Sequence, residues 1–421
     1  MRVLWISPNG GNYTDSKNKG TGGWVGAMET AVTQMHPELE LGICFLNNKG
    51  KPTFNKKRGN VTYLPIEIDY SNNVLKKIAF RYFRNTKDFH ETNAQLIAQQ
   101  VAKYKPDIIH VWGIENFYSR AIKYIKDVPI VVHIQGLASN ILYKYFSGGY
   151  SVLDAGKVDG WFNRVLLKRG YVYEYNNFIE RRSNEQEIAS LVKNWIGRTQ
   201  WDYSMTKILS PDSEYFHCDE LMRSDFDGVQ WTYHYDKNKV IISSTISECW
   251  YKGFDIILRT AKVLFDAGVH VVWNVFGISE KSKMAKYMWN KEGITPSDYG
   301  IILHGHVNAD AIMKKLLSSD MYVHPSYLEN SSNSIAEAMK IGMPVIANNI
   351  GGNASMLRDD SGILVPANEP YALATAIMSL RDKTTATEYS SRALAIAHER
   401  QNNNKVVTDL LAIYNEILNR K

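Results

Sequence analysis

The stretch HPSYLENSSNSIAEAMKIGMPVIANN, residues 324–349, holds most of one strand–helix–strand unit. The run DMYVHPS reads as a short buried strand that ends inside this stretch. A helix-forming segment follows it, and GMPVI begins the next strand. Strands that are apolar throughout are typical of a parallel sheet covered by helices on both faces. The unit therefore predicts a parallel α/β sheet in this part of the chain.

Apolar, strand-like runs alternate with helix-like segments in both halves of the chain. The apolar runs of the first half are RVLWIS, LGICFL, VTYLPI, DIIHVWG and PIVVHIQG, and those of the second half are KVIISSTI, VHVVWNVFG, YGIILHG, DMYVHPS and MPVIANN. Helix-like segments such as 254–267 and 308–319 separate them. Two batches predict two doubly wound α/β domains. We expect residues 1–235 and 236–403 to form them, with a last helix in 404–421 packing back on the first domain.

Composition places the chain among ordinary soluble proteins. Its 421 residues are 44% hydrophobic and 22% charged, and no run approaches the roughly 18 apolar residues of a spanning helix. The three cysteines, Cys44, Cys218 and Cys249, are far apart, which fits a reducing cytosol. The net charge of +6 arises in the first 200 residues. This asymmetry predicts that the first half meets an anionic partner.

Glu329 and Glu337 frame a row of small polar residues in the quoted stretch. Glu329 should lie on a loop at the carboxyl end of a strand, where open α/β sheets bind ligands. Good N-cap residues then open a helix whose free N–H groups form an anion site: Ser331, Ser332, Asn333 and Ser334. Alternatively, Ser334-x-x-Glu337 is only a capping box, and Glu329 is a solvated loop charge.

An ordered set of motifs surrounds these glutamates: P-S-x-x-E, seven residues, E-A-M, G-x-P-V-I-A, a Gly-Gly turn and G-I-L-V. This set resembles the donor-binding region of glycosyltransferase family 4, which has the GT-B fold of two Rossmann-like domains facing across a cleft. The resemblance implies that Glu337 holds the nucleotide ribose and that Glu329 positions the sugar. The family's Gly-Phe-Gly is replaced by residues 330–332, Asn-Ser-Ser, a change that bears on sugar preference.

Lys252 and Gly253 in SECWYKGFDIILRTAKVL resemble the family's Lys-Gly motif, whose lysine contacts the donor diphosphate. A lone Lys-Gly is otherwise an ordinary surface loop. Family members carry an arginine six or seven residues earlier, where this chain has Thr245 and Ile246. Arg198, from the first domain, is the candidate for the missing positive charge.

The first domain contributes a glycine-rich segment, NKGTGGWVGAMETAV. It resembles the family's N-terminal glycine loop, where backbone approaches the donor phosphates, and Gly22 and Gly23 are the candidates for that contact. The alternative is a flexible loop before a helix. Because the spacing is not G-x-G-x-x-G, a nicotinamide cofactor is not expected.

His133 ends the run PIVVHIQG. In the resembled family a histidine here lies near the donor sugar and the acceptor, and a neutral imidazole can orient a hydroxyl. His110 occupies the equivalent place on the previous strand. We expect a catalytic role for His133 and a structural one for His110.

Two basic aromatic stretches, 73–87 and 161–173, suit helices that lie on an anionic membrane surface. In the first, the candidate residues are Lys76, Lys77, Arg81 and Arg84. The alternative is a normal amphipathic helix with its charges in water. RNA binding is a third interpretation, but no RNA-binding motif accompanies the charge, so no nucleic acid is expected.

The segment 194–226 resembles a branch of the family found in bacterial capsule and exopolysaccharide synthesis. The resemblance implies a retaining glycosyltransferase that moves a hexose or related sugar from a nucleotide sugar, UDP-sugar first, to a glycan or polyprenyl-linked glycan. Glu329, His133 and Lys252 would be catalytic. No cofactor or metal is expected, since D-F-D at 225–227 lies in an irregular segment and no metal-ligand spacing occurs. A UDP-sugar epimerase on the same fold and a non-catalytic membrane- or nucleic-acid-binding protein are the alternatives.

Overall fold

The computed structural model describes residues 1–14, 23–48, 54–68, 82, 86–234 and 236–420. The chain divides into two compact units. The first contains Met1–Leu142, Phe162–Arg223 and Gln401–Lys421, and the second contains Tyr143–Trp161 and Ser224–Arg400. The chain therefore passes from the first unit to the second after residue 223 and returns after residue 400. The predicted boundaries were 235 and 403. Residues 143–161 belong to the second unit, which no feature of the sequence indicated.

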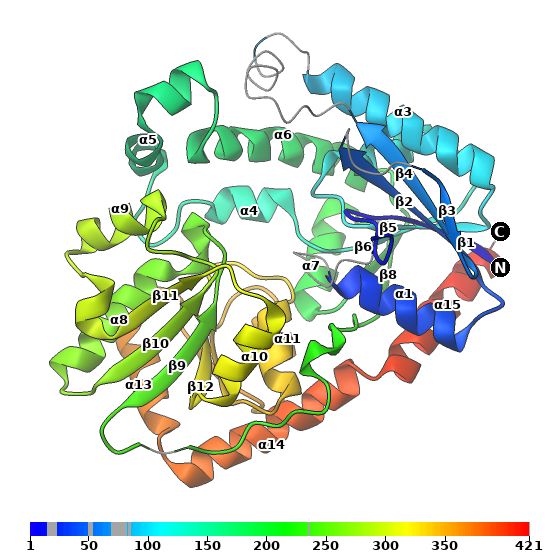
Figure 1. Cartoon of the computed structure of the whole chain (residues 1–421). Coiled ribbons are helices and arrows are strands. Elements are labelled where there is room, and N and C mark those ends of the chain that lie inside the picture. The colour runs from blue at the N-terminus through cyan, green and yellow to red at the C-terminus, as the bar shows by residue number, and fades with distance from the viewer. Residues whose placement is uncertain (15–22, 49–53, 69–81, 83–85, 235, 421) are drawn as a thin grey trace. The chain divides into compact units, whose positions relative to one another are not determined.

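The first unit is built on an eight-stranded sheet in the order β3-β4-β2-β1-β5-β6-β7-β8 (Figure 1). All neighbouring strands are parallel except β3 and β4. The five predicted runs form its centre, and the short strands β3, β7 and β8 were not predicted because polar residues interrupt them. The strands are β1 (Arg2–Ile6), β2 (Glu40–Asn48), β3 (Lys56–Arg58), β4 (Val61–Ile68), β5 (Ile108–Trp112), β6 (Ile130–His133), β7 (Asn194–Gly197) and β8 (Glu214–His217).

Helices cover both faces of this sheet. Figure 1 shows α1 (Gly23–Met35) and α15 (Asn403–Asn419) together, with α3 (Thr86–Tyr104) on the opposite side of the strands. The Tyr414 hydroxyl of α15 accepts a hydrogen bond from Trp5 Nε1 over 3.1 Å, so the last helix is part of the first unit's core. The remaining elements are η1 (Phe117–Tyr124), α4 (Ala138–Lys144), the π-helical turn η2 (Phe162–Leu166), α6 (Tyr171–Ala189) and α7 (Gln200–Leu209).

The second unit has a six-stranded, wholly parallel sheet in the order β11-β10-β9-β12-β13-β14. The quoted stretch is the end of β12, a loop, α11 and β13. The strands are β9 (Val240–Thr245), β10 (Val271–Phe276), β11 (Ile301–Gly305), β12 (Met321–His324), β13 (Val345–Asn348) and β14 (Ile363–Val365). The helices are α5 (Val152–Trp161), η3 (Ser224–Phe226), η4 (Trp250–Lys252), α8 (Phe254–Asp266), α9 (Lys283–Glu292), η5 (Pro296–Tyr299), α10 (Ala309–Leu317), α11 (Asn333–Lys340), α12 (Asn353–Met356), α13 (Pro370–Ser379) and α14 (Lys383–Arg400).

Each sheet has a point where the strand order reverses. In the second unit the chain runs from β9 to β10 and β11 on one side, and then to β12, β13 and β14 on the other. In the first unit the reversal lies between β1 and β5. Ligands of open α/β sheets bind outside the carboxyl ends of the strands at such points. In the second unit, the residues after β9 and after β12 are therefore the expected place for a ligand site.

Candidate functional site

The loop after β12 lies against the turn η4. The backbone N–H of Tyr327 donates to Tyr251 O over 2.8 Å. Gly253 has a φ of +78°, and a Cβ atom there would lie 2.1 Å from Pro325 O. Only glycine fits this approach, which gives the Lys-Gly motif a steric reason.

Lys252 and Glu329 face each other across these two loops. The Lys252 ammonium forms an ion pair with Glu329, and His324 Nε2 lies 2.9 Å from Glu329 Oε1. The Glu329 side chain is only 11% exposed. Burial opposes its ionisation, but Lys252 and His324 outweigh burial and lower the pKa of Glu329 to about 2. The structure thus brings both predicted residues together, with Glu329 as an anion and His324 as a partner that the sequence did not single out.

The Gly-Gly turn of the sequence motif, Gly351 and Gly352, packs against the backbone of Glu329. The backbone N–H of Gly352 donates to Glu329 O over 3.0 Å. A Cβ on Gly351, where φ is +51°, would lie 1.7 Å from the same oxygen. Asn348 Nδ2 donates to Pro325 O over 2.8 Å and so braces the start of the loop. The loop that carries Glu329 is therefore fixed by backbone contacts on both sides.

Helix α11 begins beside this loop. Its N-cap is Ser332, whose Oγ accepts from the backbone N–H of Ile335. The alternative of a Ser334–Glu337 capping box is therefore wrong, because Ser334 already lies inside the helix. The Ser334 Oγ lies 3.0 Å from Ser332 Oγ. Glu337 is buried one turn into the helix, five positions after this N-cap.

These groups combine two kinds of chemistry. A helix N-terminus and a lysine attract an anion such as phosphate. Carboxylates accept hydrogen bonds from hydroxyl groups, and sugars offer hydroxyls in pairs. Ser331 is partly exposed at the entrance to α11, and Asn333 is exposed. The arrangement can therefore hold a phosphorylated sugar or a nucleotide at the carboxyl edge of β9 and β12.

In the first unit, His133 ends β6 with its side chain fully buried. Its ring stacks on Trp112 with 4.9 Å between centroids, and its Nε2 lies 3.5 Å from Glu220 Oε1. Burial lowers the pKa of His133 well below its usual value, so the ring is neutral. Arg198 is also buried and bonds Glu220 Oε2 over 2.5 Å. Glu220, which reasoning from the sequence missed, therefore links the predicted His133 and Arg198.

Two further polar residues of the first unit lie on β5 or directly after it. His110 Nδ1 lies 2.6 Å from the Tyr414 hydroxyl in the core. Glu115 follows β5 at the reversal of strand order, and its Oε2 is buried with no hydrogen-bond partner in the described part of the chain. Burial raises the pKa of Glu115 to about 7, and Glu185 adds to the rise. The only feature of the sequence that could have marked Glu115 as a site residue is its position after the strand-like run DIIHVWG.

Other predicted residues are separate from this site or lie outside the described ranges. Gly22 and the membrane candidates Lys76, Lys77, Arg81 and Arg84 belong to the residues that are not described. Gly23 is the first residue of α1, and a Cβ atom added there would meet its nearest neighbour, Arg223, at 3.9 Å. The stretch 161–173 is not one helix as predicted: α5 ends at Trp161, η2 follows, and α6 begins at Tyr171 after Gly170, whose φ is +104°.

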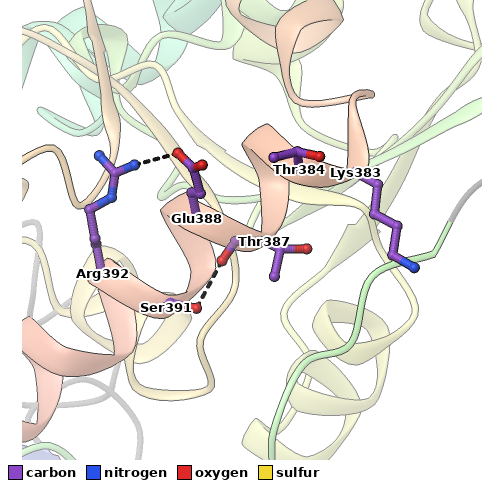
Figure 2. Close-up of a pocket in the computed structure, with 6 residues that line it drawn as sticks. All are labelled: Lys383, Thr384, Thr387, Glu388, Ser391 and Arg392. Atoms are coloured by element: carbon purple, nitrogen blue, oxygen red, sulfur yellow. Dashed lines mark hydrogen bonds and ion pairs between the residues drawn. The ribbon is translucent and has the colours of Figure 1, made fainter.

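A hollow of about 480 Å³ runs along α14 (Figure 2). Polar side chains along it already have partners within the helix: Arg392 bonds Glu388 over 2.7 Å, and Ser391 Oγ donates to the backbone carbonyl of Thr387 over 2.9 Å. None of its lining residues belongs to the loops that carry Lys252 or Glu329. The hollow is therefore a surface feature of one helix and not the candidate site.

Comparison with solved structures shows the fold class. Sucrose-phosphate synthase from Thermosynechococcus elongatus superposes with a TM-score of 0.72 at 14% identity, covering 100% of both chains. HepE of Anabaena, solved in complex with UDP and glucose, gives 0.60 at 15% identity with 99% of each chain covered. The trehalose-6-phosphate structure from E. coli bound with UDP-2-fluoro glucose gives 0.65 at 12% identity, with 99% of each chain covered. The protein thus has the GT-B fold of glycosyltransferases.

Sequence comparison finds a matching family model for part of the second unit. Residues 237–383 match the model described as Glycosyl transferases group 1, so this region is similar to that family. A Bacillus subtilis protein named for teichuronic acid biosynthesis, glycosyltransferase TuaC, is 32% identical over 83 residues, which are 20% of this chain. The match spans about a fifth of that relative, 21% of its length. In the described part of the chain, no helix is long and apolar enough to cross a membrane.

Proposed function

We propose that the chain is a retaining, metal-independent glycosyltransferase that moves a hexose or related sugar from a UDP-sugar to a hydroxyl group of a glycan or lipid-linked glycan. The observation that carries the proposal is the Lys252–Glu329 pair beside the N-terminus of α11. UDP in two of the similar structures supports a uridine donor. The short match to TuaC supports a place in bacterial surface polysaccharide synthesis, on the cytoplasmic side of the membrane.

In this proposal the acidic residues bind the hydroxyl groups of the donor, and the basic residue binds its phosphates. Glu337 accepts hydrogen bonds from the ribose hydroxyls, and Glu329 accepts them from the transferred sugar. Lys252 and the N–H groups at the start of α11, around Ser332 and Asn333, stabilise the charge that develops on the departing diphosphate. Because Lys252 is paired with Glu329 in the free protein, donor binding inserts phosphate beside the lysine and a sugar hydroxyl beside the carboxylate.

Residues of the first unit serve the acceptor side in this proposal. The neutral His133 ring orients a hydroxyl, and Glu220 holds the ring in place at 3.5 Å. Gly23, the first residue of α1, remains our candidate for backbone contact with the donor phosphates, together with Gly22, which lies outside the described residues. Arg198 is already bonded to Glu220 over 2.5 Å, so we assign it the smaller contribution to donor binding.

Thermal unfolding with UDP, GDP or ADP in the presence of EDTA tests the donor assignment. UDP at about a hundred times its dissociation constant should stabilise the protein by roughly 2.7 kcal/mol. Glu337→Gln should lose most of this stabilisation, whereas Glu388→Gln, on the exposed face of α14, should keep it. Equal stabilisation of the Glu337→Gln variant would refute the ribose role.

Product analysis then distinguishes the reactions available to this fold. A transferase consumes the UDP-sugar and releases UDP only when an acceptor hydroxyl, or slowly water, receives the sugar. Conversion of the free UDP-sugar into its epimer without UDP release would identify an epimerase instead. No effect of any nucleotide on unfolding would leave a non-catalytic binding protein.

A further inference from the structure

The π-helical turn η2, Phe162–Leu166, presents an apolar surface in the first unit. Phe162 is 57% exposed, Val165 42% and Leu166 43%. None of the three belongs to either core cluster of this unit. Single exposed apolar residues are ordinary, but adjoining ones indicate an interaction site. π-Helical turns are also rare and often lie at functional sites.

The turn has a defined shape. The backbone N–H of Leu167 donates to Phe162 O over 3.1 Å, and that of Arg169 donates to Asn163 O over the same distance. Arg169 Nε donates to Asn163 Oδ1 over 2.7 Å. These bonds fix the backbone while the apolar side chains remain outside, so little ordering is needed when a partner covers them.

The charged residues that flank this apolar surface in the sequence are all basic. Between Asp159 and Glu174 the sequence contains no acidic residue, but it contains Arg164, Lys168 and Arg169. Arg164 and Arg169 are exposed. An apolar surface with a basic margin matches the interface of an anionic lipid layer, in which acyl chains lie beneath negative headgroups.

A second part of the chain joins the turn at Tyr82. The Tyr82 hydroxyl donates to Val165 O, and Lys168 Nζ lies 3.9 Å from the centroid of the Tyr82 ring. Tyr82 is 41% exposed and belongs to the other basic aromatic stretch of the sequence, 73–87. Through Tyr82 alone, the stretch 161–173 contacts a residue of the other stretch that the sequence marks as a membrane candidate.

We propose that η2, its basic margin through Arg169 and Tyr82 form a docking surface for an anionic phospholipid bilayer, here called the η2 surface. The geometry supports shallow insertion of Phe162, Val165 and Leu166, with Arg164 at the headgroups. The proposal extends the proposed function, because such docking would bring the enzyme to a lipid-linked acceptor. Its test needs no donor sugar.

Sedimentation of the full chain with phosphatidylglycerol–phosphatidylcholine vesicles measures this docking. Phe162→Ser with Leu166→Ser should weaken vesicle binding at least ten-fold, since two apolar side chains no longer enter the bilayer. Arg164→Ser should weaken it about five-fold at low salt and less at high salt. Ile208→Ser is the matched control, because Ile208 is 72% exposed on α7 of the same unit and should leave binding unchanged.

Three results would overturn the proposal: no binding of the unchanged protein, equal binding to pure phosphatidylcholine, or full binding by the Phe162→Ser/Leu166→Ser variant. Loss of a complex with another protein, with vesicle binding intact, would assign the surface to that protein instead. Since the substituted side chains are exposed, melting temperatures should not change. UDP stabilisation, measured on the same samples, reports on the proposed function separately, so either idea can fail alone.

Discussion

The Tyr327 hydroxyl donates a hydrogen bond to Asp255 Oδ2 over 2.7 Å, and this bond joins the loop after β12 to the first turn of α8. Both residues are buried. Asp255 follows Lys252 by three positions, and Tyr327 precedes Glu329 by two. The bond therefore ties together the two segments that hold the Lys252–Glu329 pair. Arg259 Nη1, 3.4 Å from the same carboxylate oxygen, strengthens the connection.

Tyr327→Phe should destabilise the second unit by about 1–3 kcal/mol, because it leaves the buried Asp255 carboxylate with one partner fewer. UDP stabilisation should also fall, since the two loops are no longer tied. Tyr371→Phe is the control, because Tyr371 is 69% exposed and should melt like the unchanged protein. Identical melting of the Tyr327 and Tyr371 variants would show that the bond does not contribute.

Gly351→Ala should cost both stability and donor binding. The new Cβ would overlap Glu329 O, and alanine at a φ of +51° is strained, so we expect a loss above the roughly 1–3 kcal/mol typical of strain alone. Gly268→Ala is the matched control, since φ is +74° there but no atom lies within 4 Å of the Cβ position. The control should be strained yet keep its UDP stabilisation. Equal behaviour of both variants in thermal unfolding would contradict the role of Gly351 in placing Glu329.

The central strands could be predicted because they are continuous apolar runs. VLWI in β1 is buried throughout, and VVWNVF in β10 is buried except for the half-buried Val272. Burial on both faces leaves this pattern directly in the sequence. Strands β7 and β8 are four residues long and carry polar residues such as Asn194 and Glu214. Their place in the sheet depends on the pairing of β7 with β6 and of β8 with β7 rather than on their own pattern, so the sequence alone does not reveal them.

The site was predictable where chain geometry demands special residues. Gly253 and Gly351 are needed because backbone atoms approach each other, and such glycines mark a motif. His324 and Glu220 could not be found this way, because their roles depend on partners that are distant in sequence or lie across a turn. Glu220 bonds Arg198, 22 residues earlier, and only the fold brings the two together.

Glu115→Gln should change the pH dependence of stability between about pH 5 and pH 8. Because the folded-state pKa of Glu115 is raised to about 7, its contribution is present below its unfolded pKa and is lost as pH rises through 7. The unchanged protein should therefore lose up to about 3 kcal/mol between pH 5 and pH 8 from this group. The variant should lack that loss. Parallel pH profiles of the two proteins in chemical unfolding would refute the raised pKa.

Glu329 should show the opposite dependence. Its folded-state pKa is lowered to about 2, so its contribution is present above the unfolded pKa and is lost as pH falls from about 4.5 towards 2. Glu329→Gln should remove a contribution on the order of 3 kcal/mol from this acid range. Glu388→Gln, whose carboxylate pairs with Arg392 on the surface, should leave the acid profile unchanged. An unaltered profile for Glu329→Gln would show that its carboxylate is not selectively stabilised.

Lys252→Met tests whether Lys252 and Glu329 act as a pair. The single variant leaves the poorly exposed Glu329 carboxylate with His324 alone and should cost about 3–5 kcal/mol, as loss of one partner of a buried pair does. Lys252→Met combined with Glu329→Gln should cost less than Lys252→Met, because no unpaired charge remains. Both variants should lose UDP stabilisation, since the phosphate contact is gone in each. If the two stability losses simply add in a double-mutant cycle, the ion pair is not coupled in solution, and Lys252 is free for the donor before it binds.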